Sequence, residues 1–270
     1  METWPSSLSK RLSYLHYCLR CAHLRQQAPL RQQRQQQFPR NQNSLQFYVK
    51  RKDPRTAMCS LGGDGGGICS NVHDYADKMT DALRNEYVRL HNFRRSLLAK
   101  GHIPRKDGKY LPKAANMWKM SYDCNLEAEA IQYASTCPPE LSKENSRPNL
   151  GENLKKFPAT RFTFGTAAKK SVTEWWKTIR GVNYFKKAAV FRPFHDGKPI
   201  SSFTQMGWAL SNKLGCSIVK CTTENRYVGV CRYSPRGNTV NSTIYQVGNP
   251  CSLNPGNGAT TCNTAEGLWS

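Results

Sequence analysis

The chain has 270 residues, of which 38% are hydrophobic, so it can bury the core of one domain and carry an appendage. Its 40 lysine and arginine residues outnumber 18 aspartate and glutamate residues, and the net charge of +22 favours anionic partners such as nucleic acid, heparin-like glycans or anionic lipid. No run of apolar residues reaches the roughly 18 that a membrane-spanning helix needs.

Residues 1–58 differ in composition from the rest of the chain. Residues 26–37 are rich in glutamine and arginine, and Glu2 and Asp53 are the acidic residues before position 60. Such a segment cannot bury enough apolar surface to fold alone, and it contains no apolar export signal. A disordered basic tail, an organelle-targeting presequence and a wrongly predicted exon all fit it, and we favour the last. A glycine-rich linker at 59–68 follows.

The chain contains 11 cysteines, an unusual number for an intracellular protein of this size. They form no paired Cys-x-x-Cys zinc array, so they indicate an oxidising, extracellular compartment. An even set begins at residue 69 and can make four disulfides: Cys69, Cys124, Cys137, Cys216, Cys221, Cys231, Cys251 and Cys262. Cys18, Cys21 and Cys59 lie upstream.

Apolar spacing predicts three helices in the first two thirds of the chain. The first begins after Thr80, a good N-cap residue, and ends near Gly101. The second covers residues 125–137, before two prolines, and the third covers residues 166–179. In the third helix Trp175 and Trp176 fit the inward face.

The last third is predicted as β-structure, with strands at 203–210, 216–221 and 227–233. A four-residue loop joins the last two strands into a hairpin, whose register puts Cys216 opposite Cys231 and favours a disulfide there. Residues 246–270 are predicted to be a loop held by a disulfide. Helices followed by strands indicate an α+β fold.

Three short strings support a more specific interpretation: Gly-Glu-Asn-Leu at 151–154, Phe-Thr-Gln-Met-Gly-Trp at 203–208, and Val-Cys-Arg-Tyr-Ser-Pro-Arg-Gly-Asn at 230–238. With Leu-His-Asn-Phe-Arg at 90–94, they resemble the CAP superfamily (SCP/TAPS), and in particular nematode venom-allergen-like and activation-associated secreted proteins. The resemblance implies a disulfide-stabilised, three-layer α-β-α sandwich with a mostly antiparallel central sheet. It assigns residues 69–245 to the CAP domain and 246–270 to a cysteine-containing extension.

The resemblance also implies a central cleft in which two histidines and two glutamates can hold a divalent metal. Matched one by one, these positions are Leu141, Glu152, Thr178 and Ser202 in this chain. Because leucine cannot bind a metal and neutral hydroxyls are weak zinc ligands, we expect no metal and no cofactor. Glu152 is expected to stand alone in the cleft.

Two histidines remain near these motifs. His195 precedes Ser202 by seven residues and is expected to be solvated in a loop, whereas His91 is expected to make a structural hydrogen bond. A hydrolase would need a serine activated by a base, but the Gly-x-Ser-x-Gly elbow that typically presents such a serine is absent. We therefore expect no enzymatic activity.

The resemblance implies a secreted, non-catalytic protein of host interaction or immune modulation. Expected partners are host proteins, sterols or fatty acids, and anionic glycans, with nucleic acid and a membrane span excluded. A lipid-binding loop would lie at 155–165, where Phe157, Phe162 and Phe164 gather, although sealing the core is the commoner role of such residues. The alternatives are a secreted protease or other hydrolase, and a polyanion-binding basic protein. Asn241 begins an N-glycosylation sequon.

Overall fold

A computed structural model describes residues 68–69 and 79–270 of the chain. The predicted basic segment at 1–58 and all of the predicted linker except Ile68 lie outside the described residues. The boundaries drawn at residues 69, 245 and 246 stay predictions.

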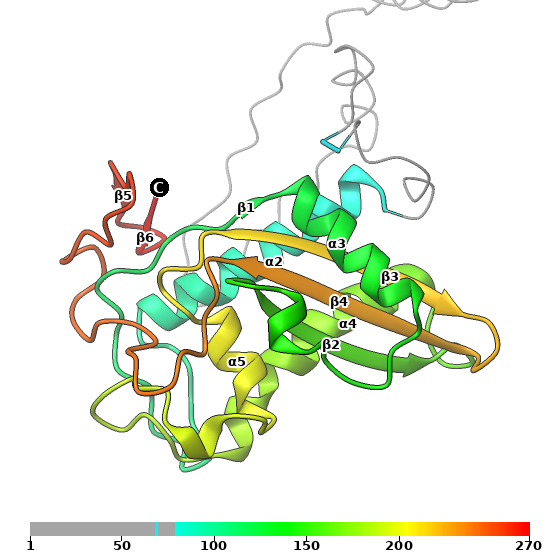
Figure 1. The fold of residues 1–270 in the computed structure, drawn as a ribbon. Helices are drawn as coiled ribbons and strands as arrows, with labels where there is room; N and C mark the ends of the chain where they lie inside the picture. Colours follow the sequence, from blue (N-terminus) through cyan, green and yellow to red (C-terminus); the bar gives the residue numbers. More distant parts are fainter. Residues whose placement is uncertain (1–67, 70–78) are drawn as a thin grey trace, which may run out of the picture. The chain divides into compact units, whose positions relative to one another are not determined.

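The central sheet has four strands in the order β1-β3-β4-β2 (Figure 1). Strands β2 (Gly151–Pro158), β3 (Lys213–Cys221) and β4 (Arg226–Ser234) are antiparallel, and the short β1 (Ser121–Tyr122) runs parallel to β3. The predicted mostly antiparallel sheet is confirmed. The hairpin register also places Cys216 opposite Cys231, as predicted.

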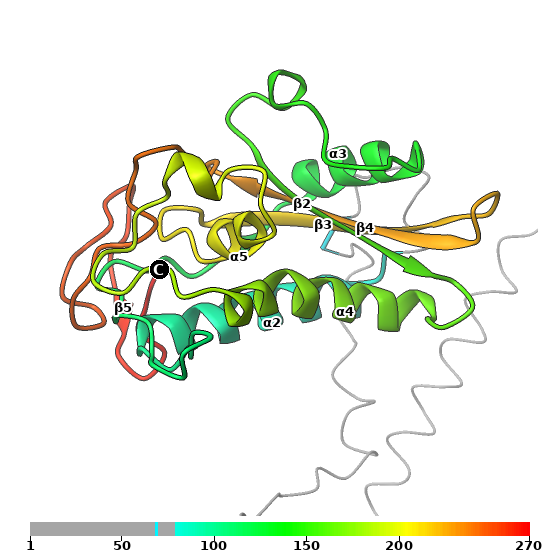
Figure 2. The ribbon, with the colours of Figure 1, turned by 90° about the horizontal axis from the view of Figure 1, so that it is seen from below.

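Helices cover both faces of the sheet (Figure 2). Helix α3 (Cys124–Ser135) packs on one face against β3 and β4, and α2 (Asp81–Ala99) and α4 (Phe164–Lys177) pack on the other. The predicted three-layer α-β-α sandwich is therefore confirmed. No helix in the described part of the chain is long and apolar enough to cross a bilayer.

The three predicted helices begin where side chains can satisfy their first backbone amides. Thr80 caps α2 through the amide of Leu83, and Asp123 caps α3. Thr163 caps α4, which begins at Phe164, two residues before the predicted start. Single-turn 3-10 helices lie at Glu144–Ser146, Thr178–Gly181 and Pro193–His195.

The predicted strand at 203–210 is wrong, because this part of the chain forms helix α5 (Ile200–Met206) and a following turn. Its aromatic and threonine content favours a strand locally. However, Ile200, Phe203 and Met206 recur every three residues and are all fully buried, and Phe203 packs against Trp176 of α4. Helical burial of this face outweighs the local preference. Strand β2 was missed for a related reason: Gly151, Glu152 and Asn153 are consecutively buried, so no alternation marks it.

Four disulfides join the eight cysteines of the domain: Cys69–Cys124, Cys137–Cys221, Cys216–Cys231 and Cys251–Cys262. The last one holds the C-terminal segment, which the sequence represented as a loop. That prediction omitted two short strands, β5 (Cys262–Asn263) and β6 (Leu268–Trp269). Leu268 is buried, and the Trp269 amide donates to the Met117 carbonyl, so the segment packs into the domain.

The face of α2 that turns inward is largely polar. Arg84, Tyr87, His91, Arg95 and Leu98 follow one another at helical spacing and are all buried. The apolar stripe predicted for this helix therefore accounts for only part of its buried surface.

The guanidinium of Arg95 binds backbone carbonyls only, and its side chain is completely buried. Its nitrogens donate to the carbonyls of Trp118, Met206, Trp208, Ala209 and Ser211 at 2.7–3.0 Å. Burial lowers its pKa to about 9, which leaves it charged at neutral pH. These bonds tie α2 to the residues before β1 and to the end of α5.

A second buried group joins α2 to α3. Arg84 binds both carboxylate oxygens of Glu127 at 2.6–2.7 Å, and Tyr122 donates to the same carboxylate. The Glu127 side chain has no exposed surface, so the bidentate pairing provides the charge that burial requires.

His91 makes structural hydrogen bonds, as expected. Its Nδ1 lies 2.8 Å from the Tyr87 carbonyl, which can only accept, so Nδ1 carries the proton and Nε2 accepts from the Tyr233 hydroxyl at 3.0 Å. Asn153 donates to the same hydroxyl. Burial lowers the pKa of His91 to about 3, and the imidazole is neutral in the folded protein.

Replacing Arg95 should therefore destabilise the fold strongly. Arg95→Met removes the guanidinium from five buried carbonyls, of which those of Trp208 and Ala209 keep a backbone amide donor. We expect a loss of about 3–5 kcal/mol in the free energy of unfolding. Arg89→Met is the matched control, because Arg89 lies on the same helix but is exposed and pairs with Glu86. Denaturant titration with the disulfides intact measures both; equal losses would contradict this role of Arg95.

His91 should make stability fall in acid. Because its pKa is about 3 when folded and about 6.5 when unfolded, only the unfolded chain binds a proton between these values. Stability is therefore lost as the pH falls from about 6.5, at up to about 1.4 kcal/mol per pH unit from this group. Denaturation curves at several pH values should show a shallower slope for His91→Gln; identical slopes would rule the effect out.

Candidate functional site

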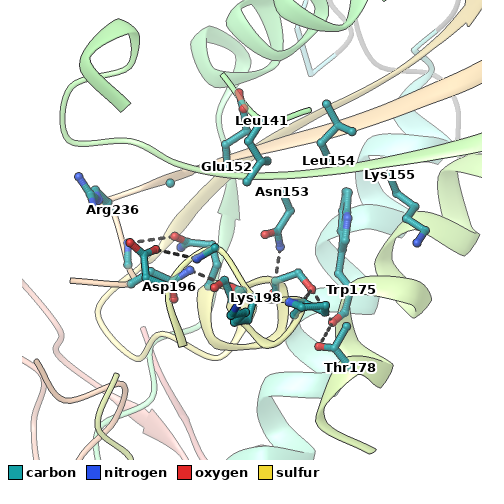
Figure 3. A pocket seen from close by; sticks show the side chains of 18 of the residues that line it. Leu141, Glu152, Asn153, Leu154, Lys155, Trp175, Thr178, Asp196, Lys198 and Arg236 are labelled. Carbon is teal, nitrogen blue, oxygen red and sulfur yellow. Dashed lines mark hydrogen bonds between the residues drawn. The ribbon is translucent and has the colours of Figure 1, made fainter. Parts of the chain in front are cut away.

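A cavity of about 420 Å³ opens beside the N-terminal half of β2 (Figure 3). The ends of α4 and α5, residues of the segment 141–147, and the loops at 196–199 and 236–238 form its other walls. All four positions matched to the family cleft line it: Leu141, Glu152, Thr178 and Ser202. The fold thus brings together residues that are up to 61 positions apart in the sequence.

The three motif strings meet around Gln205, on the wall of this cavity. A side chain at Gly151 would collide with Gln205, since a Cβ there would lie 2.0 Å from the Gln205 amide oxygen. The same oxygen accepts from the Gly237 amide at 3.1 Å. One residue from each string therefore belongs to a single packing unit, which explains why glycine stands at both ends of it.

Glu152 does not stand alone, contrary to the sequence prediction. Its Oε1 accepts from the amide and the hydroxyl of Ser142 at 2.8 and 2.9 Å, and its Oε2 accepts from Arg232 Nε at 3.1 Å. Arg147 Nε lies 3.9 Å from Oε1. The side chain has no exposed surface, so internal donors hold this carboxylate and neutralise its charge.

The sequence analysis missed three partners of Glu152: Ser142, Arg147 and Arg232, of which Arg232 is the most distant in the chain. It lies directly opposite Glu152 in the β2–β4 register, and it also binds Glu129 of α3. The pairing was missed because strand β2 was not predicted. A predicted pairing of 151–158 with 226–234 would have placed Glu152 and Arg232 together. Without that strand, nothing in the sequence linked them.

The two hydroxyls of the cleft are bound to the backbone. Thr178 Oγ1 donates to the Trp175 carbonyl at 2.9 Å, and Ser202 Oγ lies 2.8 Å from the Pro199 carbonyl and 3.1 Å from that of Trp175. Leu141 presents an apolar side chain that is 46% exposed. Figure 3 shows it beside Glu152.

His195 is buried, which corrects the expectation that it is solvated. Only 2% of it is exposed, and rings of Tyr184, Phe185, Phe191 and Phe194 surround it at 4.2–5.5 Å between centroids. Its Nδ1 accepts from the Arg192 amide at 2.9 Å, and burial, with Arg192, lowers its pKa. It does not line the cavity, and neither of its ring nitrogens bonds to Ser202.

The aromatic residues considered as ligand contacts belong to the core. Phe157 is buried and packs on Phe162 at 4.9 Å, and Phe164 packs edge-on against Tyr227. None of these phenylalanines lines the cavity. Trp175 and Trp176 are buried on the inner face of α4, as predicted from their spacing.

The predicted glycosylation residue, Asn241, is exposed in the loop that follows residue 238. Its side-chain oxygen lies 3.4 Å from Arg192 Nη1, and its amide donates to the Phe191 carbonyl. The sequon is therefore accessible, and its modification stays a prediction.

The donor set of the cavity does not fit a zinc ion. Leu141 provides no donor, the hydroxyls of Thr178 and Ser202 are neutral, and Glu152 is paired with a guanidinium. Within residues 68–69 and 79–270, no three His, Cys, Asp or Glu side chains group in a way that could hold a metal.

Comparison with known proteins gives consistent matches. The model of the cysteine-rich secretory protein family (CAP) matches residues 88–233. Ancylostoma secreted protein of Ancylostoma caninum is 40% identical over 232 residues, which are 79% of this chain and 53% of that protein. Hookworm platelet inhibitor 1 of the same species is 32% identical over 191 residues, 69% of this chain and 81% of the inhibitor.

Solved structures give the same picture. The crystal structure of Na-ASP-1 superposes with a TM-score of 0.66 at 36% identity, over 77% of this chain and 52% of Na-ASP-1. The chain thus spans about half the length of Ancylostoma secreted protein and of Na-ASP-1.

The donor set leads us to propose that the cavity holds no metal. The test is the unfolding temperature of the protein with and without 100 µM zinc, and we expect no change. A zinc site with a Kd of about 1 µM would instead stabilise the folded protein by about 2.7 kcal/mol. The double variant Leu141→His, Ser202→His adds two imidazoles beside Glu152 and is the positive control. Sub-micromolar, saturable zinc binding by the unmodified protein in isothermal titration would overturn the proposal.

Proposed function

Because the chain belongs to the cysteine-rich secretory protein (CAP) family, we propose that it is an extracellular binding protein that acts by contact with host molecules and not by catalysis. Its resemblance to nematode secreted proteins, first recognised in the motif strings, is thereby confirmed. The four disulfides support the extracellular location, because such bonds persist in oxidising compartments.

The observation that carries the non-catalytic part is the state of the cleft's polar groups. Nucleophilic catalysis needs a hydroxyl or thiol beside a base, with the base oriented by a third group. Here Ser202 Oγ faces two backbone carbonyls, His195 bonds to the Arg192 amide, and Glu152 is held by Ser142 and Arg232. Neither Thr178 nor Ser202 is hydrogen-bonded to a base, because both hydroxyls bond to backbone carbonyls.

The host-directed part is supported by the relatives. One is named a secreted protein and another a platelet inhibitor, both from a hookworm. The match to the inhibitor extends over 81% of its length, so the two chains share most of one domain. A binding role on host proteins suits a cleft whose hydroxyls are bonded to the backbone, and a surface rich in cations.

Sterol or fatty-acid binding, which the resemblance also implies, receives no support from the phenylalanines at 157–164. Their rings pack on one another and on Tyr227. We therefore place host proteins ahead of small lipids as partners.

The proposal predicts binding that depends on the fold, without turnover. Immobilised protein should retain host extracellular proteins, and the reduced and alkylated chain should not, because the four disulfides are needed for the folded surface. Mass spectrometry of the two eluates measures the difference. Identical eluates would count against the proposal.

The same preparation should not cleave a panel of fluorogenic peptide and ester substrates. Ser202→Ala is the discriminating variant, since its hydroxyl contacts only backbone carbonyls and its loss should leave the fold intact. Hydrolysis that disappears in Ser202→Ala would establish the rival hydrolase function.

A further inference from the structure

The surface that the proposed function leaves unexplained is the loop at residues 182–198, which we term the aromatic loop. It wraps around His195, and most of its rings are buried there. Phe194 is the exception, since 58% of it is exposed. The centroid of its ring lies 4.2 Å from that of His195 and 5.5 Å from that of Tyr184, so the buried cluster holds the exposed phenylalanine in position.

Four cations lie on the same loop as this phenylalanine. Lys186, Lys187, Arg192 and Lys198 are all exposed, and none of them forms an ion pair with any residue that the structure describes. Asp196 is the one acidic residue of the loop. The aromatic loop therefore carries a net positive charge that no neighbour in the described structure compensates.

The adjacent loop at residues 106–110 also exposes basic and aromatic side chains. The amide of Lys106 donates to the Val182 carbonyl at 3.1 Å, and the amide of Asp107 donates to the Asn183 side chain at 2.8 Å. These bonds hold the segment with exposed Lys109 and Tyr110, which is 63% exposed, against the start of the aromatic loop.

Another exposed phenylalanine of the domain provides a contrast. Phe93 on α2 is 54% exposed, nearly as much as Phe194. It lies in a shallow groove with Arg89 and Lys119, which pair with Glu86 and Glu266. An exposed aromatic ring beside neutralised cations is thus available in the same molecule as an internal reference.

We propose that the aromatic loop docks the protein onto anionic lipid bilayers, with Phe194 entering the headgroup region and the cations binding acidic headgroups. Burying an aromatic ring at the interface and attracting basic residues to an anionic surface are the two contributions that interfacial binding combines. A glycan would bind the cations alone, whereas an anionic bilayer offers acidic headgroups to the cations and an apolar phase to Phe194. This role goes beyond contact with host proteins and does not depend on it.

Vesicle binding of the full chain tests the proposal. Vesicles with about 30% phosphatidylserine should bind at least about tenfold more tightly than pure phosphatidylcholine, since each cation near the surface contributes about fivefold. Lys186→Glu with Lys187→Glu should weaken binding at least tenfold, and Phe194→Ala about fivefold or more. Phe93→Ala, the matched control, should change it less than twofold.

The position of the ring gives a second readout that charge elsewhere on the chain cannot mimic. Phe194→Trp should gain fluorescence quenching by brominated lipids in phosphatidylserine vesicles, and Phe93→Trp should not. All variants replace exposed residues, and their unfolding temperatures should match that of the parent. Equal vesicle binding by Phe194→Ala and the parent would overturn the proposal, as would binding to heparin without preference for anionic vesicles.

Discussion

The guanidinium of Arg95 holds together the segments that frame the cavity. It binds carbonyls before β1 and at the end of α5, and α5 carries Ser202 and Gln205 into the cavity wall. Gln205 in turn packs against Gly151 and bonds to the amide of Gly237. The position of the cleft residues therefore depends on one buried charge on α2, with backbone amides as additional donors to the carbonyls of Trp208 and Ala209.

The need of buried polar groups for internal partners also explains why the polar side chains of the cleft are engaged in hydrogen bonds. A polar group that is removed from water must find a partner inside the protein. Arg84 and Glu127 satisfy one another, His91 bonds to Tyr87 and Tyr233, and Glu152 is held by Ser142 and Arg232. The buried polar side chains of this domain thus mostly stabilise the fold, and its exposed charged side chains remain available for recognition.

More of the fold than of the candidate site could be predicted from the sequence. Helix caps such as Thr80 and the Cys216–Cys231 register are local or nearly local, and both appear in the structure as predicted. The strand predicted around Phe203 is wrong, because the strand preference of phenylalanine stabilises the chain less than burial of the helical face does. The pairing of Glu152 with Arg232 was not predicted, because the two residues lie 80 positions apart and only the unrecognised β2–β4 pairing joins them.

Glu152 is one half of a buried ion pair with Arg232 and not a free ligand of the cleft. A double-mutant cycle with Glu152→Gln, Arg232→Met and the combined variant measures their coupling in the free energy of unfolding. Residues in direct polar contact couple by about 0.5–3 kcal/mol, and we expect a value of about 1 kcal/mol or more. A coupling near zero, with each variant as stable as the parent, would show that Glu152 and Arg232 do not stabilise one another.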